Sequence, residues 1–79
     1  MTFYTFMMHR YKYADGPAGV LARDMQSDAL RFPRNRPCKF RGWHDLISGY
    51  LTDNGACPSC LDTFETCWQE YVEYEKGKK

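Results

Sequence analysis

The sequence contains no long hydrophobic run, and no apolar stretch approaches the roughly 20 residues that are needed to cross a bilayer. Its apolar opening, MTFYTFMMHRY, is too short for the core of a signal peptide and lacks both preceding positive charges and a small-residue cleavage site. We therefore expect a cytoplasmic protein without a membrane anchor. In a reducing compartment the four cysteines are expected to be thiols or metal ligands rather than structural disulfides.

Recognisable catalytic groups are also missing from the sequence. The chain has no glycine-rich phosphate loop, and no serine or cysteine stands in a known nucleophile motif. His9 lies beside Arg10, and His44 with Asp45 falls on the polar side of an expected helix, so both histidines are interpreted as surface residues. Because an enzyme needs a nucleophile or an acid–base pair held by orienting partners, we expect a non-enzymatic protein.

The composition is that of one small folded domain. A chain of 79 residues buries only about 60% of the surface that it exposes when unfolded, so its core must be dense. Hydrophobic residues at 43% and aromatic residues at 16% supply that density. We expect residues 1–75 to form the domain and residues 76–79, Lys-Gly-Lys-Lys, to form a disordered basic tail.

Apolar residues recur with helical spacing in four segments, and no stretch shows a convincing period of two. Pro17 suits the first position of the second helix, and Pro33 is expected to close it. Asp62 and Glu65 form a capping-box pattern at the start of the fourth. The sequence thus predicts a compact all-α bundle of four helices: one at about residues 3–12, one from Pro17 that ends before an extended Phe32, one at about 43–53, and one that begins near Asp62 and is ended by Gly77. It also allows a short turn near Pro58.

The inner faces of these helices define a predicted core. It contains both tryptophans and eight further apolar residues: Trp43, Trp68, Phe3, Phe6, Leu21, Met25, Leu46, Ile47, Leu51 and Phe64. Phe32 is expected to join them. The acidic residues Glu70, Glu73 and Glu75 mark the expected solvent face of the last helix.

Four motifs in this order resemble the YozE family of small bacterial proteins: TFYTFMMHRY at 2–11, Phe-Pro at 32–33, WHDLISGYL at 43–51 and TFETCWQEY at 63–71. The resemblance covers almost the whole chain and implies a helical fold similar to the sterile alpha motif. The family offers no catalytic residues to transfer, and sterile alpha motif domains elsewhere bind proteins, themselves or RNA, which is an analogy of fold alone. The sequence departs from the family pattern in a longer, more basic connection after residue 33 and in its four cysteines.

The cysteines allow a zinc hypothesis. Cys57-Pro-Ser-Cys60 has the C-x-x-C spacing that lets two thiolates bind one zinc ion, and Cys38 and Cys67 could complete a tetrahedral site, with His44 as a substitute ligand. However, only one paired motif is present, and Cys67 falls on an apolar helix face, where a thiol behaves as a small hydrophobe. We therefore expect no cofactor and keep structural zinc as an alternative. A redox role is less favoured because no strand precedes the motif.

Positive charge is concentrated in RFPRNRPCKFR, residues 31–41, which we call the basic segment. It carries Arg31, Arg34, Arg36, Lys39 and Arg41 and no acid, in a chain of net charge +1. The rest of the sequence therefore has six basic and ten acidic side chains, a net charge of −4. This separation of charge makes the basic segment the candidate binding surface.

Three interpretations of the basic segment remain open at this stage. An acidic protein partner would be attracted by steering and by Arg–carboxylate pairs. A nucleic acid would bind through its phosphates and through stacking. Alternatively, the segment is merely solvated, or it folds against the chain's own acidic last helix, with Glu65, Glu70, Glu73 and Glu75 as the available carboxylates. The sequence favours a protein-binding module that is a monomer or a weak homo-oligomer, with nucleic-acid binding as the alternative.

Overall fold

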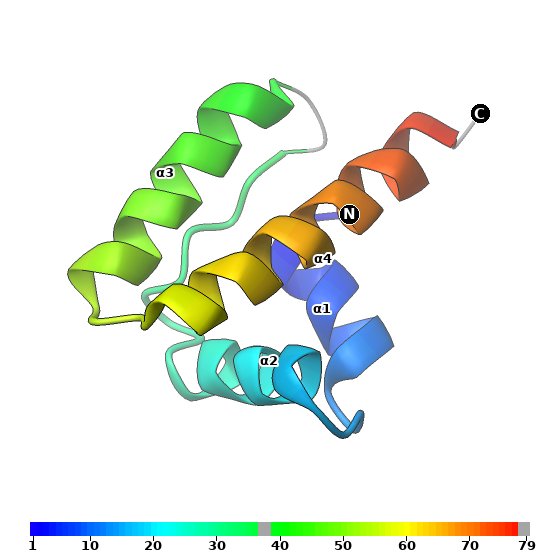
Figure 1. The fold of residues 1–79 in the computed structure, drawn as a ribbon. Helices are drawn as coiled ribbons and strands as arrows, with labels where there is room; N and C mark the ends of the chain where they lie inside the picture. The colour runs from blue at the N-terminus through cyan, green and yellow to red at the C-terminus, as the bar shows by residue number, and fades with distance from the viewer. Residues whose placement is uncertain (37–38, 78–79) are drawn as a thin grey trace.

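The computed structural model describes residues 1–36 and 39–77. These residues form four helices and no strand: α1 (Phe3–Tyr11), α2 (Pro17–Ser27), α3 (Phe40–Asp53) and α4 (Pro58–Gly77) (Figure 1). The predicted all-α class is confirmed. Within the described ranges, no helix combines the length and the apolar character that a bilayer crossing requires.

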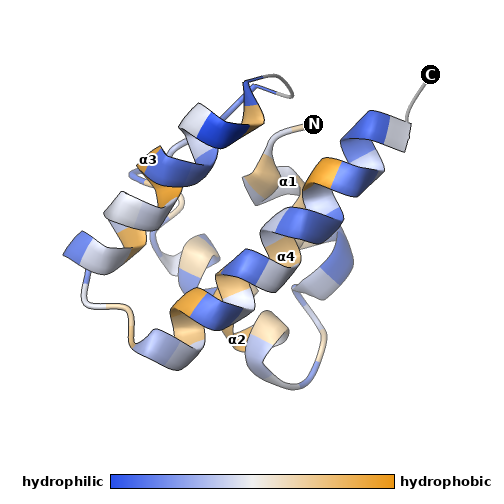
Figure 2. Ribbon diagram, turned by 45° about the horizontal axis from the view of Figure 1, so that its top comes forward, coloured by the Kyte–Doolittle hydropathy of each residue, from blue (hydrophilic) through white to orange (hydrophobic). Residues whose placement is uncertain are grey.

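Helix α4 is the central element of the fold. Its 20 residues make it about 30 Å long, and α1, α2 and α3 all pack against it. Apolar and polar residues alternate along the helices with helical periodicity, so each helix has an apolar stripe (Figure 2). Phe3 is completely buried, and its ring packs against Phe64, Trp68 and Tyr71 at centroid distances of 5.5, 5.1 and 5.6 Å. An aromatic cluster between α1 and α4 is therefore the centre of the core.

The predicted core is confirmed with one clear exception. Seven of its ten residues are buried: Phe3, Phe6, Leu21, Met25, Ile47, Phe64 and Trp68. Phe32 is buried as well. Trp43 and Leu51 are half-buried and pack against the core. The prediction was wrong for Leu46, which is 50% exposed. Helix α3 packs against α4 alone among the helices, so its buried stripe is narrow and Ile47 is its only fully buried residue.

Glycine is required at two places where α1 leads into α2, once in the connection and once in the first turn of α2. Gly16 precedes Pro17 with φ at +87°, a conformation that other residues rarely adopt. Gly19 lies against the preceding turn, where an added Cβ would stand 1.9 Å from the carbonyl oxygen of Ala14. The start of α2 at Pro17 agrees with the prediction.

Helix α2 ends earlier than predicted. Its last residue is Ser27, and the amides of Arg31 and Phe32 both donate to the carbonyl of Asp28, at 3.0 and 2.9 Å. The chain thus leaves the helix before Pro33 because this turn directs the Phe32 ring into the core, where it is 4% exposed.

Helix α4 begins earlier than predicted, at Pro58 instead of Asp62. Proline suits a first helical position, and the carbonyl of Cys57 accepts the first helical bond from the Leu61 amide at 3.0 Å. The expected turn near Pro58 is therefore the first turn of α4, and Asp62 with Glu65 lies inside the helix. At the other end, Lys76 and Gly77 still belong to α4, while residues 78 and 79 of the expected tail lie outside the described residues.

Candidate functional site

The basic segment connects α2 to α3 and is fixed to the core by Phe32. This ring packs against Tyr4 of α1 at 6.0 Å and against Tyr50 of α3 at 5.5 Å between centroids. From there the chain passes in an extended conformation towards the start of α3 (Figure 1). Pro37 and Cys38 lie outside the described residues. The described part of the segment therefore begins at a ring that is held between aromatic side chains of two helices.

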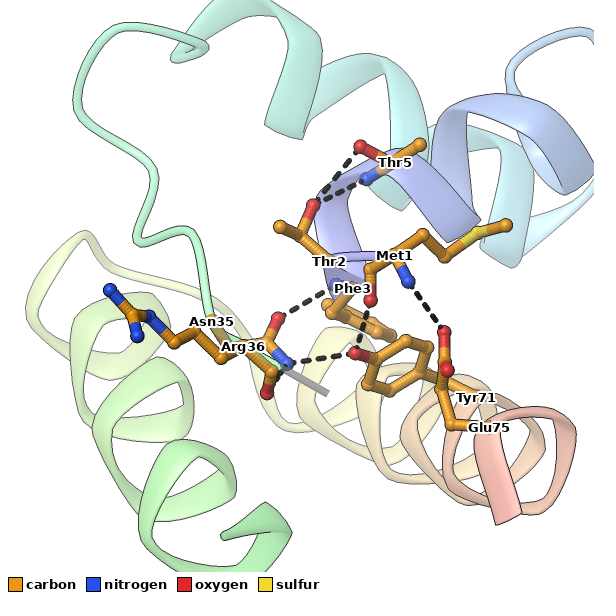
Figure 3. Close-up of polar contacts among 8 residues, drawn as sticks. All are labelled: Met1, Thr2, Phe3, Thr5, Asn35, Arg36, Tyr71 and Glu75. Carbon is orange, nitrogen blue, oxygen red and sulfur yellow. Dashed lines mark hydrogen bonds and ion pairs between the residues drawn. The ribbon is translucent and has the colours of Figure 1, made fainter. Parts of the chain in front are cut away.

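Asn35 is the second attachment point, and it is buried with 1% exposure. Its Oδ1 accepts the Phe3 amide at 2.7 Å, and its Nδ2 donates to the Tyr71 hydroxyl at 2.9 Å and to the Arg36 carbonyl at 3.0 Å (Figure 3). The Tyr71 hydroxyl in turn donates to the Met1 carbonyl at 2.6 Å. One amide side chain thus joins the basic segment to α1 and α4. Sequence reasoning missed this role, because nothing in the pattern distinguishes a buried asparagine from a solvated one.

The five cations of the basic segment are all exposed. Arg34 lies over the Tyr4 ring, with its guanidinium carbon 3.6 Å from the ring centroid. In Figure 3 the Arg36 side chain points away from the Asn35 cluster. Lys39, in a left-handed conformation with φ at 52°, precedes α3, and Arg41 lies in its first turn. The segment therefore presents positive charge outwards beside its two buried attachments.

The carboxylates of α4 do not neutralise this charge within the described residues. Glu75 pairs with the Met1 ammonium at 2.8 Å, Glu70 accepts a hydrogen bond from the Tyr11 hydroxyl, and Glu73 accepts one from Gln69 at 3.3 Å. Across residues 1–36 and 39–77, no ion pair involves a cation of the basic segment. The predicted solvent face of α4 was wrong for Glu75, whose side chain is 6% exposed because it binds the amino terminus. The described ion pairs and hydrogen bonds of these carboxylates are therefore made with groups outside the basic segment.

His44 is not the simple surface histidine that the sequence suggested. Its side chain is 29% exposed, its Nε2 contacts the Glu65 carboxylate, and its Nδ1 lies 3.0 Å from Asp45. The ring also packs over Phe64 at 5.4 Å and near Trp68 at 5.9 Å. Burial acts to lower the pKa of His44, but the hydrogen bonds to Glu65 and Asp45 outweigh it and hold the pKa above its ordinary value. The contact between His44 and Glu65 therefore links α3 to α4.

The three cysteines that the structure describes lie just before α4 and within it, and they are not gathered at one point. Cys57 is exposed just before the helix and Cys60 lies in its first turn, whereas Cys67 is buried, which raises the pKa of its thiol to about 11. Cys60 and Cys67 are separated by about 10 Å along the helix axis. Two thiolates on one zinc ion, with bonds of about 2.3 Å, lie only about 4 Å apart. Over the described residues no three possible metal ligands come together, and Cys38 of the proposed set lies outside them.

Comparison with known proteins bears on the fold. No curated protein and no solved structure matches the chain significantly. The family described as the YozE SAM-like fold, by contrast, matches residues 2–73. That range takes in all of α1, α2 and α3, most of α4, and the whole basic segment between them. The four-helix arrangement and this match agree, and the chain belongs to the YozE family of SAM-like fold.

Proposed function

We propose that this protein is a non-enzymatic, cytoplasmic binding module that engages an acidic surface of another protein through its basic segment, itself a monomer or a weak homo-oligomer. The observation that carries the proposal is the exposure of unneutralised cations on a segment held at Phe32 and Asn35. A segment fixed in this way loses little conformational entropy on binding, so more of the interaction energy becomes affinity.

The partner's side of the interface would consist of carboxylates. Arginine forms bidentate pairs with carboxylates, and Arg31, Arg36 and Arg41 are exposed with no described ion pair. Leu30, which precedes Arg31 in the sequence and is fully exposed, would add apolar contact area next to that arginine. A charged rim with a small apolar contact is typical of transient protein interfaces.

Nucleic acid is the second candidate for the same surface. Arg34 stacked on Tyr4 resembles the cation and aromatic combinations that bind single strands. Against it, only one short segment is basic, and the exposed side of α4 carries Glu65 and Glu73, which would repel a phosphate backbone. We therefore rank the acidic protein first.

The test uses a double variant and a charge-matched control. Arg36→Ala with Arg41→Ala removes two cations of the segment, whereas Arg10→Ala with Lys76→Ala removes two exposed cations elsewhere. Binding proteins captured from lysate of the source cells are purified, and their affinity for each variant is measured by calorimetry. We expect the segment variant to bind about 10–100-fold more weakly, since hydrogen bonds between charged groups contribute about 1.5–3 kcal/mol, and the control to bind like wild type.

Single-stranded DNA and RNA oligonucleotides form the second arm of the test. At physiological salt we expect dissociation constants no tighter than the non-specific range of about 10⁻⁴–10⁻⁶ M. A submicromolar complex that is lost in the segment variant, with log K falling by roughly 0.7–0.9 per neutralised phosphate as log salt rises, would favour nucleic acid instead. Equal loss of protein binding in both double variants would refute the assignment of the surface.

A further inference from the structure

The early start of α4 changes the setting of the C-x-x-C motif. The sequence placed Cys57 and Cys60 in a connection, but Cys57 is the residue whose carbonyl accepts the first helical bond, and Cys60 lies in the first turn. The amide groups at a helix start carry partial positive charge, which stabilises an anion there. A helix start is one of the settings that lower the pKa of a cysteine and so favour its thiolate.

The side chains around Cys57 give a second, independent observation. Its Sγ lies 3.1 Å from the Ser59 Oγ. Hydrogen bonds from the Ser59 hydroxyl, from the Cys60 backbone and from the Cys60 thiol lower the pKa of Cys57 to about 7. The pKa of Cys60 is raised by its hydrogen bond with Cys57, by partial burial and by the negative charge of Asp24. One thiol of the pair is thus exposed and easily ionised, while its neighbour retains its proton.

Both cysteines line the same pocket, which is the third observation. The pocket has a volume of about 460 Å³ and lies between α2, α3 and the start of α4. Such a volume falls within the range of small-molecule sites. Leu21, Met25 and Tyr50 contribute apolar surface, and the carboxylates of Asp24 and Asp28 come from α2 and its C-terminal end. The pocket therefore suits a small organic molecule that is uncharged or cationic.

We propose that Cys57 and Cys60 form a thiol–disulfide exchange site for small uncharged or cationic disulfides, in which Cys57 attacks and Cys60 resolves. The Cys57 thiolate attacks one sulfur of the disulfide RSSR, forming a Cys57–SR bond and releasing RS⁻. Cys60 gives its proton to that RS⁻, and its thiolate then attacks the Cys57 sulfur. A Cys57–Cys60 disulfide forms, and the second RS⁻ leaves and takes a proton from water. Two protein thiols are oxidised, and RSSR is reduced to two RSH.

The test treats the reduced full-length protein with cystamine and follows its intact mass and its cysteine-containing peptides. Wild type is expected to lose two hydrogens and to retain no adduct, with the new disulfide joining Cys57 to Cys60. Cys60→Ser should retain one cysteamine adduct on Cys57, and Cys57→Ser should leave Cys60 unreacted over the same time. The series is repeated on a Cys38→Ser background, which excludes resolution by that residue.

The rate at which Cys57 attacks the disulfide shows whether the folded structure makes this thiol more reactive. At pH 7 a thiol with a pKa of about 7 has roughly 15 times more thiolate than one at about 8.5, but its nucleophilicity is about fivefold lower. In folded wild type, the initial rate at which Cys57 attacks cystamine should therefore be about threefold higher than that of the same residue in urea, and Ser59→Ala should reduce this advantage. A persistent adduct in wild type, or a disulfide that involves Cys38 and not Cys60, would overturn the proposal.

A preference for cationic over anionic disulfides distinguishes a disulfide that binds in the pocket from one that reacts with an exposed thiol without binding there. Relative to free cysteine, Cys57 should prefer dicationic cystamine over anionic glutathione disulfide, because Asp24 and Asp28 line the pocket. The double variant Asp24→Asn with Asp28→Asn should lose most of this preference, and Asp15→Asn, on an exposed turn outside the pocket, should keep it. The same preference in all three proteins would show that the pocket does not take up the disulfide.

Discussion

Replacing Asn35 by alanine should destabilise the protein far more than its place in a polar, basic segment suggests. The change removes the acceptor of the Phe3 amide and the donor to the Tyr71 hydroxyl, both buried, together with the bond to the Arg36 carbonyl. Alanine cannot replace any of these groups, and the surrounding helices leave little access for water, since Asn35 is 1% exposed.

The magnitude follows from which groups remain unpaired. A buried amide without an acceptor costs about 1–3 kcal/mol, and this applies to Phe3. The other two bonds contribute about 0.5–1.5 kcal/mol each, but Tyr71 keeps its bond to the Met1 carbonyl, and the carbonyl of exposed Arg36 can bind water. We expect a loss of about 2–4 kcal/mol out of a total stability of about 4–12 kcal/mol for a domain of this size.

Thermal unfolding followed by circular dichroism measures this loss. In a domain of this length each kcal/mol shifts Tm by about 4–8 °C, so Asn35→Ala should lower Tm by roughly 10–30 °C. Asn54→Ala is the matched control, because its Nδ2 donates to the Tyr50 carbonyl at 2.8 Å in an exposed position, and it should cost less than about 1 kcal/mol. If both variants lost the same stability, the basic segment would not be held by Asn35, and the rigidity on which the proposed function depends would be refuted.

Three further outcomes are expected. Trp68→Ala should lower the free energy of unfolding by about 3–5 kcal/mol, whereas Leu46→Ala, at a half-exposed position on α3, should lower it by less than about 1 kcal/mol. Equal losses of stability in denaturant titrations would contradict the observed core. Because the folded pKa of His44 is raised, its pair with Glu65 should stabilise the protein below about pH 6.5 and lose that contribution as pH rises through the folded pKa. A double-mutant cycle of His44→Gln and Glu65→Gln should give a coupling of about 0.5–1 kcal/mol near pH 6 and almost none near pH 8.5, and a coupling that is independent of pH would exclude the charged pair. Protein purified without added zinc should contain well under one equivalent of metal and keep its Tm in chelator, and stoichiometric zinc by elemental analysis would restore the zinc alternative.

The sequence was sufficient to predict the helical class and most of the core. Apolar residues at helical spacing determine which face of each helix is buried, and this periodicity alone assigns Phe3, Phe64 and Trp68 to one core. Pro17 and the Asn54-Gly55 pair located two helix boundaries correctly, since their backbone preferences act locally. These are features that depend on neighbours along the chain.

The boundaries of α4 and the roles of polar residues were decided by tertiary structure. The capping-box pattern at Asp62 was a plausible local start, but the helix extends back to Pro58, which brings both cysteines of the C-x-x-C motif to its amino-terminal end. Glu65 binds His44, 21 residues away in sequence, and Asn35 bonds to Tyr71, 36 residues away. A polar side chain is buried or solvated according to whether distant segments supply its hydrogen-bond partners, and no local pattern encodes that pairing.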